Sequence, residues 1–207
     1  MTKIKVCGIK TREAYERLQE LGADYIGFVF AKSKRQVTPE QAADLGEKKA
    51  DGPARVGVFV NETVEGLLHT AEVAGLHVLQ LHGDESPEFC RKLRQRTNLQ
   101  IWKAWGVHND ERDAVLAAYT DVVDAVLLDN ERGGTGEKFP WDAIPALRAY
   151  TQDLPLFIAG GLHPDNVGDL LAAHSTDGVD VSSGVETQGV KDLAKITAFV
   201  TKVREQR

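Results

Sequence analysis

Residues 155–184 read PLFIAGGLHPDNVGDLLAAHSTDGVDVSSG, and this stretch contains one complete repeat of the pattern that decides the fold. An apolar run at 155–159 is followed by two glycines, a helix that we expect to begin at Pro164, and a second apolar run at 178–182. Strand, helix and strand in this order are typical of a parallel sheet, because parallel neighbours need a crossover connection. The stretch therefore predicts a unit of α/β structure.

The same rhythm extends over the whole chain. Short runs rich in Val, Ile, Leu and Phe are each followed by a polar turn and a segment with helical periodicity. The eight runs lie at 4–7, 25–30, 55–60, 77–81, 101–105, 124–128, 155–159 and 178–182. Eight such units in 207 residues predict a single-domain (β/α)8 barrel over residues 1–207. An open doubly wound sheet is the alternative, but it normally carries G-x-G-x-x-G after its first strand, which CGIKTREA at 7–14 lacks.

Local signals place several helix ends. Thr38, followed by a proline and then by Gln41, predicts a capping box at a helix start, and Ser86 before a proline predicts another start. Apolar residues spaced as one stripe over 64–71 predict a helix that packs on a sheet, and Gly75 can end it in the left-handed conformation.

Composition excludes several classes of function. The net charge of -6 argues against a nucleic-acid or anionic-membrane surface, since both need a basic face. The apolar runs are too short to span a membrane, and the N-terminus lacks the features of a signal peptide, so we expect a cytoplasmic protein. Cys7 and Cys90 lie 83 positions apart, which implies neither a disulfide framework nor a zinc site, and Cys90 is expected to pack in the core. The histidines offer no metal spacing, so no metal is expected.

The exits of the predicted strands are where a barrel of this kind places its chemistry, because the eight loops there surround one mouth. Polar or small residues replace apolar ones at these exits. Among them are Cys7, Arg35, His82, Asp129, Gly160 with Gly161, and Ser183 with Gly184.

The glycines after the seventh and eighth runs indicate a phosphate site. A glycine lets backbone N–H groups approach a phosphate closely, and a helix N-terminus adds partial positive charge. The alternative is that Gly160, Gly161 and Gly184 only turn tight corners. Two such loops on adjacent strands favour phosphate binding, which is common at this place in the fold.

Asp129 is a candidate general acid, because it follows a buried strand where desolvation favours the protonated carboxyl. The alternative is an Asx turn. The next stretch, NERGGTGEKF at 130–139, is glycine-rich and lacks the Gly-Lys-Ser/Thr ending of a nucleotide-binding loop. We interpret it as a lid or substrate-lining loop, and the alternative is a flexible surface connection.

Three other side chains allow both a functional and a structural interpretation. Cys7 could be a small core residue or a reactive thiol at the mouth. His82 could cap a turn or contact substrate, and it cannot pair with His77 because an odd spacing on a strand sends the two rings to opposite faces. Arg35 could be a solvated surface residue or could bind a carboxylate in bidentate fashion through its planar guanidinium.

The chain resembles the phosphoribosylanthranilate isomerase family of tryptophan biosynthesis over nearly its whole length. The motifs that carry the resemblance, in chain order, are KVCGIK, GADYIGFVF, KSKRQVTPEQA, VGVFVN, LQLHGDE, VLLD, GGTGEKFPW, IAGGLHPDNV and DVSSGVET. Each motif is weak alone, but the ordered set is specific.

The resemblance implies an aldose–ketose isomerase. Its reaction is an Amadori rearrangement of N-(5'-phosphoribosyl)anthranilate to 1-(2-carboxyphenylamino)-1-deoxyribulose 5-phosphate, the third step of tryptophan synthesis from chorismate, without a cofactor. The site residues that it implies are Cys7 as general base, Asp129 as general acid, Arg35, His82 and Asp180 as substrate contacts, and Gly160, Gly161, Ser183 and Gly184 as the phosphate loops.

Three alternatives share the fold. Indole-3-glycerol-phosphate synthase relies on catalytic lysine and glutamate and usually carries an N-terminal extension, whereas this barrel is expected to begin at residue 4. A histidine-pathway aminoaldose isomerase uses paired aspartates, and position 7 here is cysteine. A non-catalytic sugar-phosphate-binding barrel is the third, because fold alone does not fix function. We expect a small phosphorylated substrate as the partner, and a monomer rather than a homodimer.

Overall fold

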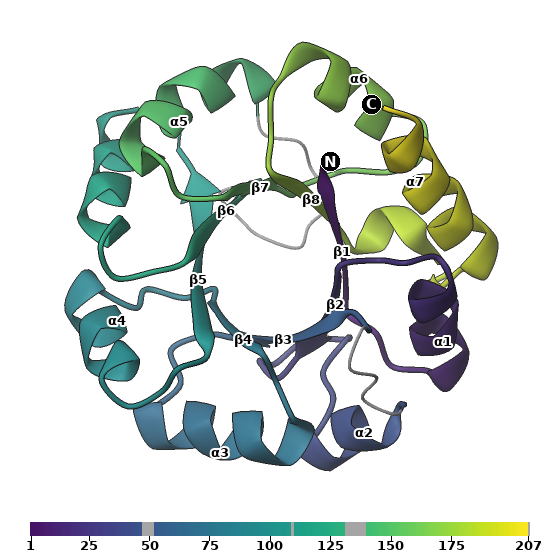
Figure 1. Cartoon of the computed structure of the whole chain (residues 1–207), viewed down its shortest axis with the longest axis horizontal. Helices are drawn as coiled ribbons and strands as arrows, with labels where there is room; N and C mark the ends of the chain where they lie inside the picture. The colour runs from purple at the N-terminus through teal and green to yellow at the C-terminus, as the bar shows by residue number, and fades with distance from the viewer. Residues whose placement is uncertain (47–51, 109, 131–139, 207) are drawn as a thin grey trace.

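Eight parallel strands close into a barrel in chain order, and helices ring it on the outside (Figure 1). The computed structural model describes residues 1–46, 52–108, 110–130 and 140–206. The strands are β1 (Lys3–Cys7), β2 (Tyr25–Val29), β3 (Ala54–Phe59), β4 (Val78–Leu81), β5 (Gln100–Val107), β6 (Ala125–Asn130), β7 (Leu156–Ile158) and β8 (Gly178–Val181). Each overlaps one of the eight apolar runs, so the predicted (β/α)8 barrel is confirmed and the open doubly wound sheet is excluded.

The outer layer consists of α-helices and short 3-10 segments. The α-helices are α1 (Arg12–Glu20), α2 (Pro39–Asp44), α3 (Val64–Ala74), α4 (Pro87–Arg94), α5 (Ile144–Thr151), α6 (Val167–Ala173) and α7 (Leu193–Glu205). The 3-10 segments are η1 (Glu111–Tyr119), η2 (Trp141–Ala143) and η3 (Ser183–Val185). A small antiparallel pair, β9 (Glu186–Thr187) and β10 (Val190–Lys191), follows β8 and η3.

The predicted capping signals are confirmed. The hydroxyl of Thr38 accepts from the backbone N–H of Gln41, and the Gln41 side chain accepts from the N–H of Thr38, which completes the capping box of α2. Ser86 caps α4 through its hydroxyl, which accepts from the backbone N–H of Phe89. Gly75 ends α3 in the left-handed conformation, with φ of 62°.

Two of the boundaries that differ from the sequence prediction have a local cause. The helix expected to begin at Pro164 begins at Val167, because the side chain of Asn166 accepts from His163 N–H and holds the preceding residues in a turn. Asp129 was expected after the sixth strand but lies within β6, because its pairing with Gly106 continues the ladder between β5 and β6.

The barrel interior is apolar at one end and polar at the other. Near the amino-terminal ends of the strands, the rings of Tyr25, Trp102 and Phe157 pack together, with centroids 4.4–5.6 Å apart. Towards the carboxyl ends, inward side chains become charged, as in the pair between Lys5 of β1 and Asp180 of β8. The apolar side chains fill the barrel at the amino-terminal end, and the polar side chains at the carboxyl end are available for a functional site. Among the described residues, no helix combines the length and apolar character needed to cross a membrane.

Candidate active site

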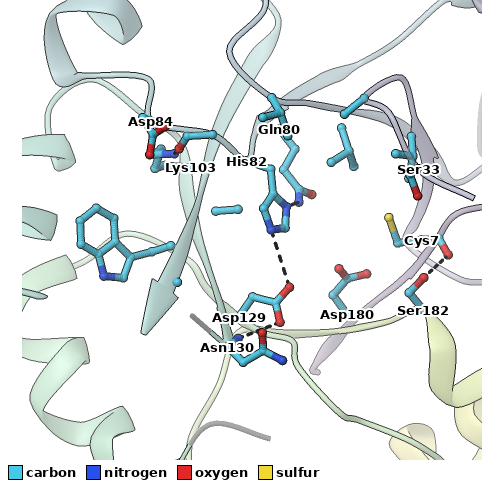
Figure 2. A pocket seen from close by; sticks show the side chains of 18 of the residues that line it. Cys7, Ser33, Gln80, His82, Asp84, Lys103, Asp129, Asn130, Asp180 and Ser182 are labelled. Atoms are coloured by element: carbon cyan, nitrogen blue, oxygen red, sulfur yellow. Dashed lines mark hydrogen bonds and ion pairs between the residues drawn. The ribbon is translucent and has the colours of Figure 1, made fainter. Parts of the chain in front are cut away.

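A cavity of about 930 Å³ opens at the carboxyl ends of the strands. Five of the residues singled out from the sequence line it together, namely Cys7, Arg35, His82, Asp129 and Asp180. Cys7 and Asp129 enter it from opposite sides, and Asp180 lies between them in the view of Figure 2. The predicted phosphate-loop residues Gly160, Gly161, Ser183 and Gly184 are not among the residues that line this cavity.

Cys7 ends β1 with its thiol directed into the cavity. Its side chain has room because residue 27 of the neighbouring strand is glycine, and a Cβ on Gly27 would lie 2.8 Å from the Cys7 sulfur. Burial raises the pKa of the Cys7 thiol, and the positive charge of Lys5 opposes that rise. Cys7 is therefore a buried thiol that lines the cavity next to a cation. A cysteine that only packed in the apolar core would have neither neighbour.

The Asp129 carboxylate binds the backbone of the next residue on one side and faces a histidine on the other. Its Oδ1 accepts from the N–H of Asn130 at 2.8 Å, and its Oδ2 lies 3.7 Å from His82 Nε2. One oxygen is thus fixed while the other is presented to the cavity.

The protonation state of His82 follows from its partners. Its Nδ1 lies 3.2 Å from Gln80 Nε2, and because an amide N–H donates, Nδ1 accepts and the ring hydrogen sits on Nε2. Burial, Lys5 and Lys103 lower the pKa of His82 to about 4, so the ring is neutral at neutral pH. A neutral His82 therefore directs an N–H toward Asp129 (Figure 2).

Arg35 binds a carboxylate, and in this structure the carboxylate belongs to Glu186. Its Nε donates to Oε1 at 2.6 Å and its Nη2 to Oε2 at 2.9 Å. Lys191 also donates to Glu186 Oε1, at 2.7 Å. Although burial alone would raise it, Arg35 and Lys191 lower the pKa of Glu186 to about 2. Sequence reasoning missed both Glu186 and Lys191.

Asp180 forms a buried ion pair with Lys5, whose Nζ lies 3.0 Å from Asp180 Oδ2. The other oxygen, Oδ1, is buried and has no hydrogen-bond partner among the described residues. A buried acceptor without a partner is unusual in a folded protein. Lys5 was also missed, although strand alternation from an inward Cys7 would have placed it inside the barrel.

The two predicted phosphate loops lie against each other next to the cavity. Gly160 and Gly161 have φ of 75° and 67°, a region that favours glycine. A Cβ on Gly184 would collide with the carbonyl oxygen of Leu162, so the loop after β8 packs on the loop after β7. The glycines therefore do turn corners, and they also bring the backbones of the two loops together beside Ser182 of the cavity wall.

Some expectations concern residues away from the cavity or outside the description. Cys90 is buried in the core on α4, as predicted, and both cysteines are free thiols. The stretch 130–139 that we interpreted as a lid lies, except for Asn130, outside the described residues. Across the described ranges, no group of three or more His, Cys, Asp or Glu side chains is placed to hold a metal ion.

Comparison with known proteins gives one consistent result. Residues 4–202 match the family model described as N-(5'phosphoribosyl)anthranilate (PRA) isomerase. A protein named N-(5'-phosphoribosyl)anthranilate isomerase from Brevibacillus brevis is 48% identical over 210 residues, covering 99% of this chain and 94% of that protein. One of the same name from a Thermoanaerobacter species is 42% identical over 207 residues, covering 99% of this chain and 98% of that one.

Solved structures agree with the sequence relatives. The phosphoribosyl anthranilate isomerase from Thermotoga maritima superposes with a TM-score of 0.89 at 36% identity, covering 99% of this chain and 100% of that one. A phosphoribosyl anthranilate isomerase solved in complex with reduced 1-(o-carboxyphenylamino)-1-deoxyribulose 5-phosphate superposes with a TM-score of 0.86 at 37% identity, with the same coverage.

Proposed function

The chain belongs to the N-(5'-phosphoribosyl)anthranilate isomerase family, and we propose that Cys7 and Asp129 carry out its reaction as general base and general acid. The enzyme converts N-(5'-phosphoribosyl)anthranilate, an aminoaldose, into the aminoketose 1-(2-carboxyphenylamino)-1-deoxyribulose 5-phosphate in tryptophan biosynthesis. The observation that supports the two roles is that a thiol and a carboxyl, 8% and 7% exposed, face one cavity from opposite sides.

The first step opens the furanose ring. Asp129 donates a proton to the ring oxygen, the bond between that oxygen and C1 breaks, and the nitrogen lone pair forms a C1=N iminium ion. The oxygen keeps the bonding pair, so the step needs only one proton from the protein. The carboxylate left on Asp129 faces the N–H of neutral His82, which stabilises the new negative charge.

The second step moves the proton at C2. The iminium ion makes this proton acidic, and the Cys7 thiolate removes it, leaving an enolamine with a C1=C2 double bond. The Cys7 thiol then returns its proton to C1, and the Asp129 carboxylate accepts the hydroxyl proton at O2, which gives the ketone and restores the starting protonation state of both groups. C1 is reduced and C2 is oxidised within one molecule, so the electrons balance without an external oxidant.

The ends of the substrate bind at the two sides of the mouth. The phosphate binds the backbone N–H groups of the loops that contain Gly160, Gly161, Ser183 and Gly184. Glu186 occupies the Nε and Nη2 positions of Arg35, so the carboxylate of the anthranilate group binds the remaining edge, at Nη1. Asp180 Oδ1, a buried acceptor, takes a hydrogen bond from a hydroxyl of the opened sugar.

The deciding experiment measures turnover of freshly generated phosphoribosylanthranilate through the loss of its fluorescence. We expect Cys7→Ala and Asp129→Asn to lower kcat by about 10²–10⁴-fold. Each variant should still bind the product analogue, reduced 1-(o-carboxyphenylamino)-1-deoxyribulose 5-phosphate. Cys90→Ala, a buried thiol outside the cavity, and Asp121→Asn, an exposed carboxylate beside the amino-terminal end of β6, are the matched controls. Near-normal turnover in either site variant would remove that residue from the proposed role.

We further propose that the enzyme works as a cytoplasmic monomer without nucleic-acid partners. Among the described residues, the large exposed apolar side chains are few and scattered, as for Val60 and Val115 at the mouth and Val190 on β10. The net charge of -6 disfavours nucleic acid. Light scattering on the purified chain tests whether it is a monomer, and the distribution of a tagged chain between cell fractions tests its location.

A further inference from the structure

Lys5 is a fully buried cation on the inner face of the barrel. It precedes Cys7 by two positions on β1, and because side chains alternate along a strand, the two point to the same side. Lys5 is 0% exposed, and its Nζ is 3.0 Å from Asp180 Oδ2. Burying an ion pair is costly, and well-packed apolar residues of similar volume often stabilise a fold equally well. Stability alone therefore gives little reason for a lysine at this position.

We propose that Lys5 is a positioning residue that stabilises the thiolate of Cys7, with Asp180 holding the Lys5 ammonium in place beside it. The proposal deepens the proposed function, since it rests on Cys7 acting as the base. It assigns the buried ion pair a part in the reaction that is separate from any contact with substrate.

The charges around Cys7 support this role. The groups that act on it are Lys5 on its own strand, Asp180 on β8, Lys191 on β10 and Arg35 in the loop after β2. Arg35 and Lys191 both bind Glu186, whose carboxylate offsets part of their positive charge. Lys5 is the cation with the largest influence on the thiol.

The coupling between Lys5 and Cys7 acts in both directions. Burial raises the pKa of Cys7, and the positive charge of Lys5 lowers it. Burial alone would lower the pKa of Lys5, but Asp180 and Cys7 raise it above its ordinary value. Lys5 therefore stays charged inside the barrel, where a cation favours the form of Cys7 that can accept a proton.

The test measures the thiolate directly, through the pH dependence of Cys7 alkylation by iodoacetamide, followed on the peptide that contains it. Burial raises the pKa of Cys90 to about 11, so this second thiol is not expected to obscure the result. We expect Lys5→Met to raise the alkylation midpoint by about one pH unit, since a nearby opposite charge shifts a pKa by about 1–3 units and Asp180 partly opposes it here.

Lys5→Met leaves the Asp180 carboxylate buried without its partner and could fail to fold. The double variant Lys5→Met/Asp180→Asn removes both charges together. Because Lys5 acts on Cys7 more strongly than Asp180 does, the midpoint is still expected to rise. Lys3→Met is the matched control, because Lys3 lies on the same strand but pairs with Asp24 at the surface. An unchanged midpoint in the double variant would show that the ion pair is only structural and would overturn the proposal.

The experiment separates this proposal from the proposed function. If Cys7→Ala keeps full activity, Cys7 is not the base, and both the role proposed for Cys7 and this proposal fail, whatever the alkylation shows. If Cys7→Ala is inactive but the alkylation midpoint does not move in the Lys5→Met/Asp180→Asn variant, Cys7 remains the base, and Lys5 does not stabilise its thiolate. Agreement with the proposal requires that the pH profile of kcat/KM in the single Lys5 variant shift to higher pH along with the alkylation midpoint.

Discussion

Arg35 and Glu186, 151 positions apart in the chain, form a bidentate ion pair at the rim of the cavity. The pair connects the loop after β2 to β9, the strand that follows β8. Because β1 lies between β2 and β8 in the barrel, the pair spans the carboxyl end of β1. A guanidinium fixed at two of its nitrogens is oriented before any ligand arrives, so less conformational entropy is lost when a third group binds it.

Arg35→Ala is expected to weaken substrate binding without removing the chemistry. Loss of a hydrogen bond to a charged group costs about 1.5–3 kcal/mol, so KM should rise on the order of 10–100-fold while kcat changes little. Arg96→Ala, which removes an exposed arginine paired with Glu65, is the control and should leave KM unchanged.

The chemical partner of Arg35 is tested with a ligand instead of a second variant. A product analogue with a phenyl group in place of the carboxyphenyl group should bind wild type and Arg35→Ala equally. If Arg35→Ala weakens the binding of the phenyl analogue as much as that of the carboxyphenyl analogue, the carboxylate binds elsewhere.

Glu186 should make the stability of the fold sensitive to acid. Its pKa is lowered to about 2 in the folded state, below the ordinary value of 4.5. A lowered folded-state pKa gives stability that is present above the unfolded value and is lost as the pH falls from about 4.5 towards about 2. Replacing Glu186 by Gln removes this titration, so the Tm of Glu186→Gln should fall less steeply over that window than the Tm of wild type. Parallel Tm curves for the two proteins would show that Glu186 is not strongly paired in solution.

His82 should stay neutral far below the usual range for histidine. Nitrogen-15 NMR is expected to show hydrogen on Nε2, none on Nδ1, and a titration midpoint about pH 4. Since this folded-state pKa lies below 6.5, the proton binds the unfolded chain better, and His82 reduces stability as the pH falls below 6.5. A hydrogen on Nδ1 would mean that the Gln80 amide is turned round and that His82 has no N–H to give Asp129.

The fold could be predicted from sequence because its signals are local. The barrel strands are short runs rich in apolar residues, and caps such as Thr38 with Gln41 lie within one turn of the helix they begin. Cys7 and Asp129 were found for the same reason, since a polar residue at the end of an apolar run must reach the mouth of a barrel.

The partners of those residues could not be predicted because barrel closure brings them together. Lys5 and Asp180 are 175 positions apart, and they meet only because β1 pairs with β8. Glu186 and Lys191 follow the last barrel strand in a segment with no apolar run, so periodicity says nothing about where they lie. The start of α6 was misplaced for a smaller reason, because the Asn166 side chain replaces the first helical turn with its own hydrogen bonds.

Gly184→Ala should damage the fold and phosphate binding together. The new Cβ would collide with the carbonyl oxygen of Leu162, and a backbone atom cannot move aside as the end of a flexible side chain can. The loops after β7 and β8 would separate, so Tm should fall and the affinity for inorganic phosphate should fall with it. Gly168→Ala is the matched control, because its Cβ would meet only side-chain atoms, those of the flexible Lys202 at 3.0 Å and of Gln206 at 3.5 Å. Within α6 that change should preserve phosphate affinity and raise stability by up to about 1 kcal/mol. A Gly184→Ala protein with lowered Tm but unchanged phosphate affinity would place the phosphate away from these two loops.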